Sequence, residues 1–123
     1  SALSMIFAVA LSAQCGNWKN SPEKDAIETA HVLYRDFVKA KEFEKAFPKW
    51  EIAYKGAPAA DGTRSFHYSD GVTLHLDLFA KETDAAKKAE RNARIVKLHE
   101  QCIECLETKK IKKTKLYCFS KKI

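Results

Sequence analysis

The chain has 123 residues, enough for one domain and too few for two ordinary ones. Hydrophobic residues make up 46% of it, as is typical of a globular chain that buries a core. Its formal net charge is +6, but the residues from Lys109 onward alone contribute +7, through seven lysines and no acid. The rest of the chain is therefore close to neutral, at −1, which argues against nucleic-acid binding by the fold itself.

An uncharged apolar run, residues 2–13, opens the chain. This run is short for a membrane span and suits a signal-peptide core, so residues 1–14 are predicted to be a secretion signal. Export across the inner membrane would place the protein in the periplasm or at the outer membrane. Two alternatives stay open, an ordinary packed helix and a lipoprotein signal in which Cys15 is acylated. Gln14 argues against the lipoprotein, because that cleavage site usually needs Gly, Ala or Ser.

Two helices are predicted next, over residues 22–40 and 42–55. Ser21-Pro22-Glu23 supplies a cap, a first-turn proline and an acid, which together are a strong helix start. The first helix is expected to bury Ala30, Leu33 and Phe37, with Ile27 and Tyr34 on the flank of that face. The second is expected to bury a face in which Trp50 fills the space beside small residues: Phe43, Ala46, Phe47, Trp50, Ala53 and Tyr54. The clearest turn of the chain follows at residues 56–62.

This stretch resembles a tetratricopeptide repeat, a helix–turn–helix unit of about 34 residues. The spacings Leu33-Tyr34-x2-Phe37 and Ala46-x3-Trp50-x2-Ala53, closed by Pro58, fall into the register of that repeat. Ala30 and Tyr34 depart from it, because they stand where the repeat usually has tryptophan and glycine. The wording F-E-K-A-F-P-K-W, F-H-Y-S-D-G and E-T-D-A-A-K-K-A is also similar to a subgroup of secreted bacterial tetratricopeptide proteins. The resemblance covers roughly residues 18–106.

The segment from residue 66 to 79 allows two interpretations. Val72, Leu74, Leu76 and Leu78 alternate with polar residues, and Asp70-Gly71 before them is a good hairpin turn. The resemblance instead implies a helix, and we predict that helix. A long capped helix is expected from Thr83 to Glu107, with an apolar side formed by Ala86, Ala89, Ala93, Val96 and Ile103.

The predicted fold class is therefore all-α, built of helix–turn–helix repeats that form about two hairpins of an α-solenoid. Residues 21–107 make up the helical domain, with one repeat at 27–60 and a degenerate second repeat at 61–107. Residues 108–123 form a basic tail. Since about three repeats are normally needed for stability, a partner or self-association through the open repeat end is expected.

The resemblance also implies a binding groove, because the first helix of a tetratricopeptide hairpin lines the concave surface. His31, Arg35 and Lys39 share one stripe of that helix, and Glu28 begins the next row. Two cations and a titratable ring suit an acidic extended peptide, which arginine can hold with two parallel hydrogen bonds. The alternative is that these are solvated residues balanced by neighbouring acids.

No catalytic motif is found in the sequence, so no enzyme and no cofactor are predicted. His67 and His75 flank an apolar helix face and are expected to be solvated. His99, Cys102 and Cys105 are weak candidates for a metal or redox site, because a fourth ligand is missing and the two cysteines lie late in a helix. Packing or a disulfide is the other interpretation of these cysteines.

The predicted function is a non-catalytic protein-interaction scaffold of the cell envelope. One alternative is a basic adaptor that binds nucleic acid or anionic lipid through the lysine-rich tail. The other is a small metal or redox protein that uses Cys102 and Cys105. Membrane association is expected only if Cys15 carries a lipid.

Overall fold

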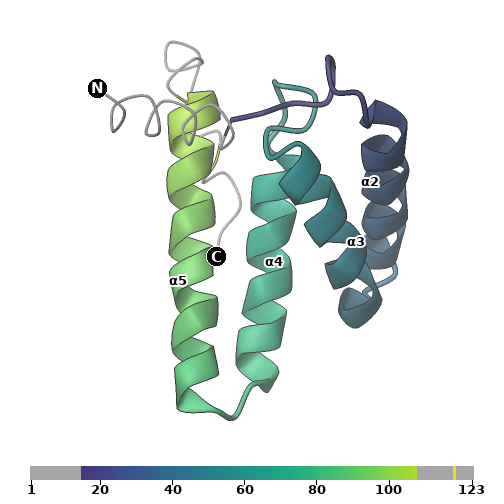
Figure 1. The fold of residues 1–123 in the computed structure, drawn as a ribbon. Coiled ribbons are helices and arrows are strands. Elements are labelled where there is room, and N and C mark those ends of the chain that lie inside the picture. Colours follow the sequence, from purple (N-terminus) through teal and green to yellow (C-terminus); the bar gives the residue numbers. More distant parts are fainter. Residues whose placement is uncertain (1–14, 108–117, 119–123) are drawn as a thin grey trace.

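The computed structural model describes residues 15–107 and Cys118, and every regular element within them is a helix. The elements are, in order, α2 (Lys24–Lys39), α3 (Phe43–Gly56), α4 (Phe66–Lys81), α5 (Ala85–Cys102) and the π-helix η1 (Ile103–Glu107). α2 pairs with α3 and α4 pairs with α5, so the chain forms two helical hairpins joined by packing of α3 on α4 (Figure 1). The predicted all-α, helix–turn–helix architecture is confirmed. The predicted signal, residues 1–14, lies outside the described residues.

Local sequence signals set the helix ends. The Ser21 hydroxyl accepts a hydrogen bond from the Glu23 amide at 3.1 Å, just before α2 begins. Lys41 takes the left-handed conformation, at φ 61°, and reverses the chain between α2 and α3. Asp84 caps α5 by accepting a hydrogen bond from the Lys87 amide at 2.9 Å. The predicted boundaries of these three helices are therefore right to within a few residues at their capped ends.

The segment that allowed two interpretations is a helix, so the β-hairpin alternative is wrong. α4 runs without a break through Asp70 and Gly71, which lie inside the helix rather than at a turn. Both residues are buried, as are Tyr68, Val72 and Leu74. A helix lets α4 bury side chains against α3 on one side and α5 on the other, whereas an isolated two-stranded hairpin is marginally stable.

Trp50 is the centre of the core, and its predicted burial is confirmed at 0% exposure. Ala46 and Ala53 beside it are also fully buried, as expected. Its surroundings differ from the prediction, because the ring reaches beyond α2 and α3 to the second hairpin. The Trp50 indole N–H donates a hydrogen bond to the His67 carbonyl at 2.8 Å, and the ring stacks on Tyr54 at 4.9 Å. Trp50 therefore joins the two hairpins.

Two predicted helix faces are rotated from the observed ones. On α2, Leu33 is 39% exposed, while Tyr34, expected on the flank, is fully buried. On α5, the alanine-rich row from Ala86 to Val96 is exposed, and the buried row is Ile95, Leu98 and Cys102. Adjacent rows of one helix satisfy the same periodicity. On α5 the row with the larger apolar side chains is the buried one, whereas on α2 Tyr34 is buried with its hydroxyl bonded to Asp70.

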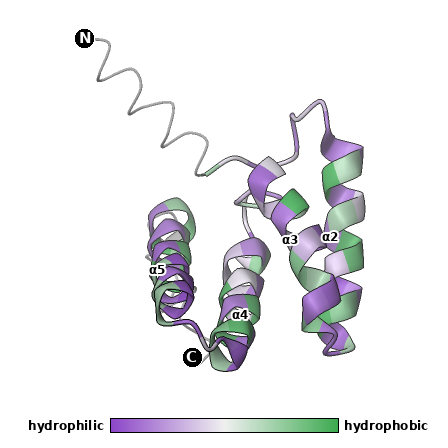
Figure 2. Ribbon diagram, turned by 60° about the horizontal axis from the view of Figure 1, so that its bottom comes forward, coloured by the Kyte–Doolittle hydropathy of each residue, from purple (hydrophilic) through white to green (hydrophobic). Residues whose placement is uncertain are grey.

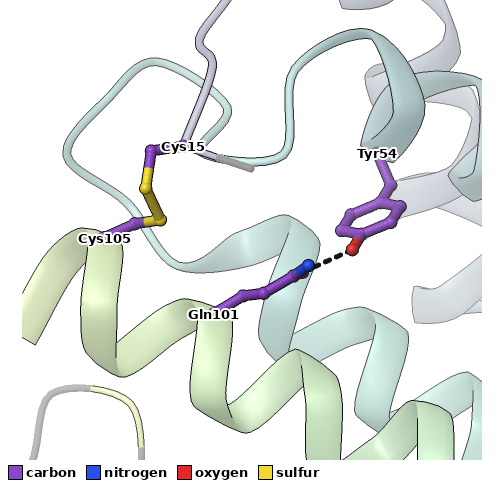
Figure 3. The surroundings of a disulfide bond; sticks show 4 residues. All are labelled: Cys15, Tyr54, Gln101 and Cys105. Atoms are coloured by element: carbon purple, nitrogen blue, oxygen red, sulfur yellow. Dashed lines mark hydrogen bonds between the residues drawn. A yellow bond between two sulfur atoms is a disulfide. The ribbon is translucent and has the colours of Figure 1, made fainter. Parts of the chain in front are cut away.

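The segment before α2 fastens the two hairpins together. Its backbone pairs with the α3–α4 loop, through hydrogen bonds from the Trp18 amide to the Ala60 carbonyl at 2.9 Å and from the Ala59 amide to the Gly16 carbonyl at 2.8 Å. Cys15 forms a disulfide with Cys105 in η1 (Figure 3). This bond closes a loop across almost the whole described domain, so the start of the domain is tied to its end.

Beside this disulfide, Tyr54 on α3 donates a hydrogen bond to Gln101 on α5 (Figure 3). Gln101 is buried, and this bond gives its side chain a partner. A second disulfide joins Cys102 to Cys118, so the basic tail is covalently attached to α5 at Cys118. The remainder of the tail, residues 108–117 and 119–123, lies outside the described residues.

Candidate functional site

The predicted groove residues all lie on α2, but they play different roles. His31 and Arg35 face the second hairpin and contact α4 directly. Glu28 lines a cavity beside them and forms an exposed ion pair with Lys24 at 3.9 Å. Lys39 is exposed in the last turn of α2. The structure therefore brings together three of the four residues and leaves Lys39 apart.

Arg35 forms an ion pair with a buried carboxylate of the second hairpin. Its guanidinium donates to the Asp70 carboxylate at 2.7 Å, and the Tyr34 hydroxyl donates to the same oxygen at 2.7 Å. Asp70 is only 5% exposed, so its charge needs both donors. Burial and the Asp70 carboxylate raise the pKa of Tyr34, which keeps its proton in place. Arg35 is therefore paired with a carboxylate of its own chain, which makes it less available for an acidic peptide than the sequence predicts.

A chain of two histidines runs from the core to the surface. The His67 Nδ1–H donates to the Ala57 carbonyl at 2.6 Å, since a carbonyl can only accept. Burial lowers the pKa of His67 to about 4, so at neutral pH its Nε2 is an acceptor. The His31 Nδ1–H must therefore donate to His67 Nε2, 2.8 Å away. Burial and then Arg35 lower the pKa of His31, which leaves its Nε2 as a free acceptor.

A cavity of about 310 Å³ lies beside this histidine, between α2, the α3–α4 loop and the start of α4. We call it the α2–α4 cavity; its lining is Trp18, Glu28, His31, Val32, Ala60, Asp61, Arg64 and Phe66. The rings of Trp18 and His31 meet edge to face at 5.2 Å. Ala60 holds a left-handed φ of 54° at the cavity wall, a strained conformation for a residue with a side chain.

The two acids of the α2–α4 cavity, Asp61 and Glu28, differ in their hydrogen bonds and in their exposure to solvent. Asp61 accepts hydrogen bonds from the Thr63 and Arg64 amides at 3.0 Å, and these bonds hold its pKa below the usual range although burial opposes them. Arg64 lies 3.5 Å from the Asp61 carboxylate, in an exposed pair. Glu28 is more open to solvent. The cavity therefore offers two carboxylates, two aromatic walls and a neutral histidine acceptor, which suit a cationic group with hydrogen-bond donors.

The cysteines do not form the metal or redox site that was the weak alternative. Cys102 and Cys105 are bound to Cys118 and Cys15, not to each other, so neither offers a thiolate. Across residues 15–107 and Cys118, no group of three metal-binding side chains comes together. The Cys15 sulfur is bonded to Cys105, whereas the lipoprotein alternative needs that sulfur for a lipid. The interpretation of these cysteines as disulfide partners is confirmed.

Several residues of the site are not identified from the sequence, or are expected from it to be exposed. Trp18 is not singled out from the sequence. His67 and His75 are expected to be solvated, yet these two histidines are only 0% and 1% exposed. The available signal is the helical spacing of His67, Asp70 and Leu74, which places polar residues on a buried row of α4. The sequence does not show which residue such a polar side chain bonds to, so this spacing alone does not establish a buried hydrogen-bond network.

No family model, curated protein or solved structure matches this chain. None of the helices in the described part of the chain combines the length and the apolar character that crossing a membrane requires.

Proposed function

We propose that the chain is a non-catalytic protein-interaction module whose α2–α4 cavity receives a lysine or arginine side chain from an extended segment of a partner protein. The observation that carries this proposal is the histidine chain, which makes His31 Nε2 a hydrogen-bond acceptor beside Glu28 and Asp61. A cationic side chain donates several hydrogen bonds and accepts none, so it matches this lining.

The charge of the site favours a basic rather than an acidic partner. Arg35, the cation on which an acidic peptide would depend, is paired with Asp70 at 2.7 Å. Of the side chains that line the cavity, Glu28 and Asp61 are acidic and only Arg64 is basic. Glu28 and Asp61 are themselves paired, with Lys24 at 3.9 Å and with Arg64 at 3.5 Å, but these pairs are longer and more exposed than the pair of Arg35 with Asp70. An acidic peptide would meet these two carboxylates, which repel it.

The size and walls of the cavity suit one long side chain. A volume of about 310 Å³ is at the lower end of the range for small-ligand sites. The Arg35 guanidinium lies over the Phe66 ring, 4.2 Å from its centroid, and so covers part of that ring. The rest of the Phe66 ring and the Trp18 ring supply the apolar contact. Aliphatic stems of lysine and arginine pack well on such surfaces.

The architecture supports the role of a scaffold. Two helical hairpins placed side by side are the unit of tetratricopeptide-like solenoids, in which a face made by the first helices binds extended segments. We propose that the second hairpin is the degenerate second repeat. Both disulfides support an oxidising compartment, consistent with export to the periplasm or outer membrane.

The test is an NMR titration with three short peptides, acetyl-Ala-Xaa-Ala-amide, in which Xaa is Arg, Gln or Glu. The arginine peptide should shift the resonances of the Trp18 indole and the His31 ring, and the other two should bind more weakly. Glu28→Gln should weaken the arginine peptide by about 1 kcal/mol, or about fivefold, as for a partly exposed ion pair.

The matched control is Glu44→Gln, the same change at an exposed position of α3 outside the cavity, which should leave binding unchanged. Stronger binding of the glutamate peptide would replace the proposal with the acidic-partner version. Equal binding of all three peptides, or equal effects of the two substitutions, would remove the cavity as the binding site.

A further inference from the structure

A second, larger pocket lies between α3, α4 and α5 and shares no residue with the α2–α4 cavity. Its volume is about 640 Å³, within the usual range for sites that hold small organic molecules. We call it the α3–α5 pocket; its lining is Phe47, Glu51, His75, Glu82, Lys87, Glu90, Arg91, Ala93, Arg94 and Lys97. Most of these residues come from α5, much of whose ribbon has the purple of hydrophilic residues in Figure 2.

The cations of this pocket, Lys87, Arg91, Arg94 and Lys97, form no ion pair with any described residue. Among the described residues, the ion pairs join other side chains, and none includes a residue of the α3–α5 pocket. Arg91 and Arg94 lie one turn apart on α5, so both guanidinium groups serve the same pocket. Arg91 also sits over the Phe47 ring, with 5.4 Å from its guanidinium carbon to the ring centroid.

His75 adds a buried donor to these cations. It is 1% exposed, and its Nδ1 lies 3.4 Å from a nitrogen of Arg91. A guanidinium can only donate, so Nδ1 accepts this long hydrogen bond and the ring proton resides on Nε2. Within the described part of the chain, that Nε2 has no hydrogen-bond partner. A buried donor without an acceptor costs free energy, and such groups often mark a place where something binds.

From these observations we infer that the α3–α5 pocket binds a small organic anion, in which one carboxylate or phosphate group is attached to an apolar body. Arg91 and Arg94 would hold the anionic oxygens through their paired N–H groups. Phe47 and Ala93 supply apolar wall for the body of the ligand. The three glutamates of the lining limit the net positive charge, so a ligand with one anionic group fits better than a polyanion.

The test is titration of the full chain, with its disulfides formed, by four probes followed by NMR. Phenyl phosphate and benzoate carry both features of the expected ligand and differ in the anionic group. Inorganic phosphate carries the charge without the body, and benzyl alcohol the body without the charge. At least one of the first two should bind saturably and shift the amides of Arg91 and Arg94 and the imino proton of His75.

Arg94→Gln should weaken that binding at least tenfold. Arg94 has no hydrogen bond or ion pair with any described residue, so the variant should fold, which circular dichroism checks. Lys55→Gln is the control, with the same loss of charge at an exposed residue of α3 outside both pockets, and it should leave binding unchanged. Lys97→Gln, within the lining, should give an intermediate loss.

Each other result would overturn a stated part of the inference. Absence of saturable binding by both phenyl phosphate and benzoate refutes the site. Equal losses in Arg94→Gln and Lys55→Gln mean attraction by net charge rather than a site. Benzyl alcohol binding as tightly as the anions removes the role of the arginines, and inorganic phosphate binding as tightly removes the apolar body.

Discussion

Gly71 on α4 lies against Trp50 of the first hairpin, and replacing it with alanine is a sensitive test of the packing. A Cβ at this position would lie 2.9 Å from Cε2 of Trp50 and closer still to Cζ2, and 3.0 Å from Cδ1 of Leu98. Real Cβ atoms essentially never come within 3.0 Å of such neighbours. Trp50 cannot easily move away, since its indole N–H is bonded to the His67 carbonyl and its ring is stacked on Tyr54.

Two effects of Gly71→Ala oppose each other. Alanine is favoured over glycine inside a helix by about 1 kcal/mol, which alone would stabilise the protein. Overpacking a well-filled core costs about 1–3 kcal/mol, and a clash with a fixed aromatic ring belongs at the upper end. The net result should be a loss of about 1–2 kcal/mol in the free energy of unfolding.

Urea denaturation followed by circular dichroism measures this loss as a lower midpoint with an unchanged slope. The matched background is Trp50→Phe, in which the smaller ring leaves room for the new methyl group. In that background Gly71→Ala should be neutral or stabilising by up to about 1 kcal/mol. The effect of Gly71→Ala changes sign because residue 71 and the ring at position 50 are in direct contact. If Gly71→Ala stabilises the wild type by about 1 kcal/mol, as at an open helix position, the close approach of the hairpins is refuted.

Stability should also fall in acid. In the folded protein burial lowers the pKa of His67 and His75 to about 4, below the ordinary 6.5. Between pH 6.5 and pH 4 the unfolded chain therefore binds more protons than the folded one, and stability is lost as the pH falls from about 7 towards 4. At pH 5 the loss should reach up to about 2 kcal/mol for each histidine, and urea midpoints that coincide at pH 7 and pH 5 would contradict their burial. Each disulfide should stabilise by limiting the unfolded chain: about 3 kcal/mol for Cys102–Cys118, which spans 16 residues, and between about 4 and 5 kcal/mol for Cys15–Cys105, which spans 90. Thermal melts of Cys118→Ser and Cys15→Ser test both values, and melts that do not change on adding a reducing agent would show that the bonds contribute nothing.

Local patterns in the sequence are enough to predict three of the helices, α2, α3 and α5, whereas for α4 the pattern also allows a hairpin and the resemblance decides the prediction. Helix starts depend on residues near in the chain, such as the cap formed by Asp84, and the turn at residues 56–62 depends on its own glycines and proline. The burial of Trp50 with Ala46 and Ala53 also follows from spacing along one helix, because a large ring beside two small residues fits a close helix contact.

Which face of each helix is buried could not be predicted in the same way. Tyr34 and Leu33 are neighbours in the sequence, and Tyr34 is the buried one, with its hydroxyl bonded to Asp70 on α4. The roles of His31 and Arg35 likewise depend on partners more than 30 residues away along the chain. Periodicity describes one helix at a time, whereas hydrogen bonding and burial depend on pairs of elements.

The cysteines illustrate the same division. The sequence alone shows four cysteines and a C-x-x-C spacing, which is compatible with a metal site, a redox pair or disulfides. The tertiary structure decides among them, because it brings the Cα atom of Cys15 to 5.4 Å from that of Cys105 across 90 residues of chain, and no local pattern encodes that distance. Both candidate sites have the same origin: the α2–α4 cavity and the α3–α5 pocket exist only where helices from different hairpins meet.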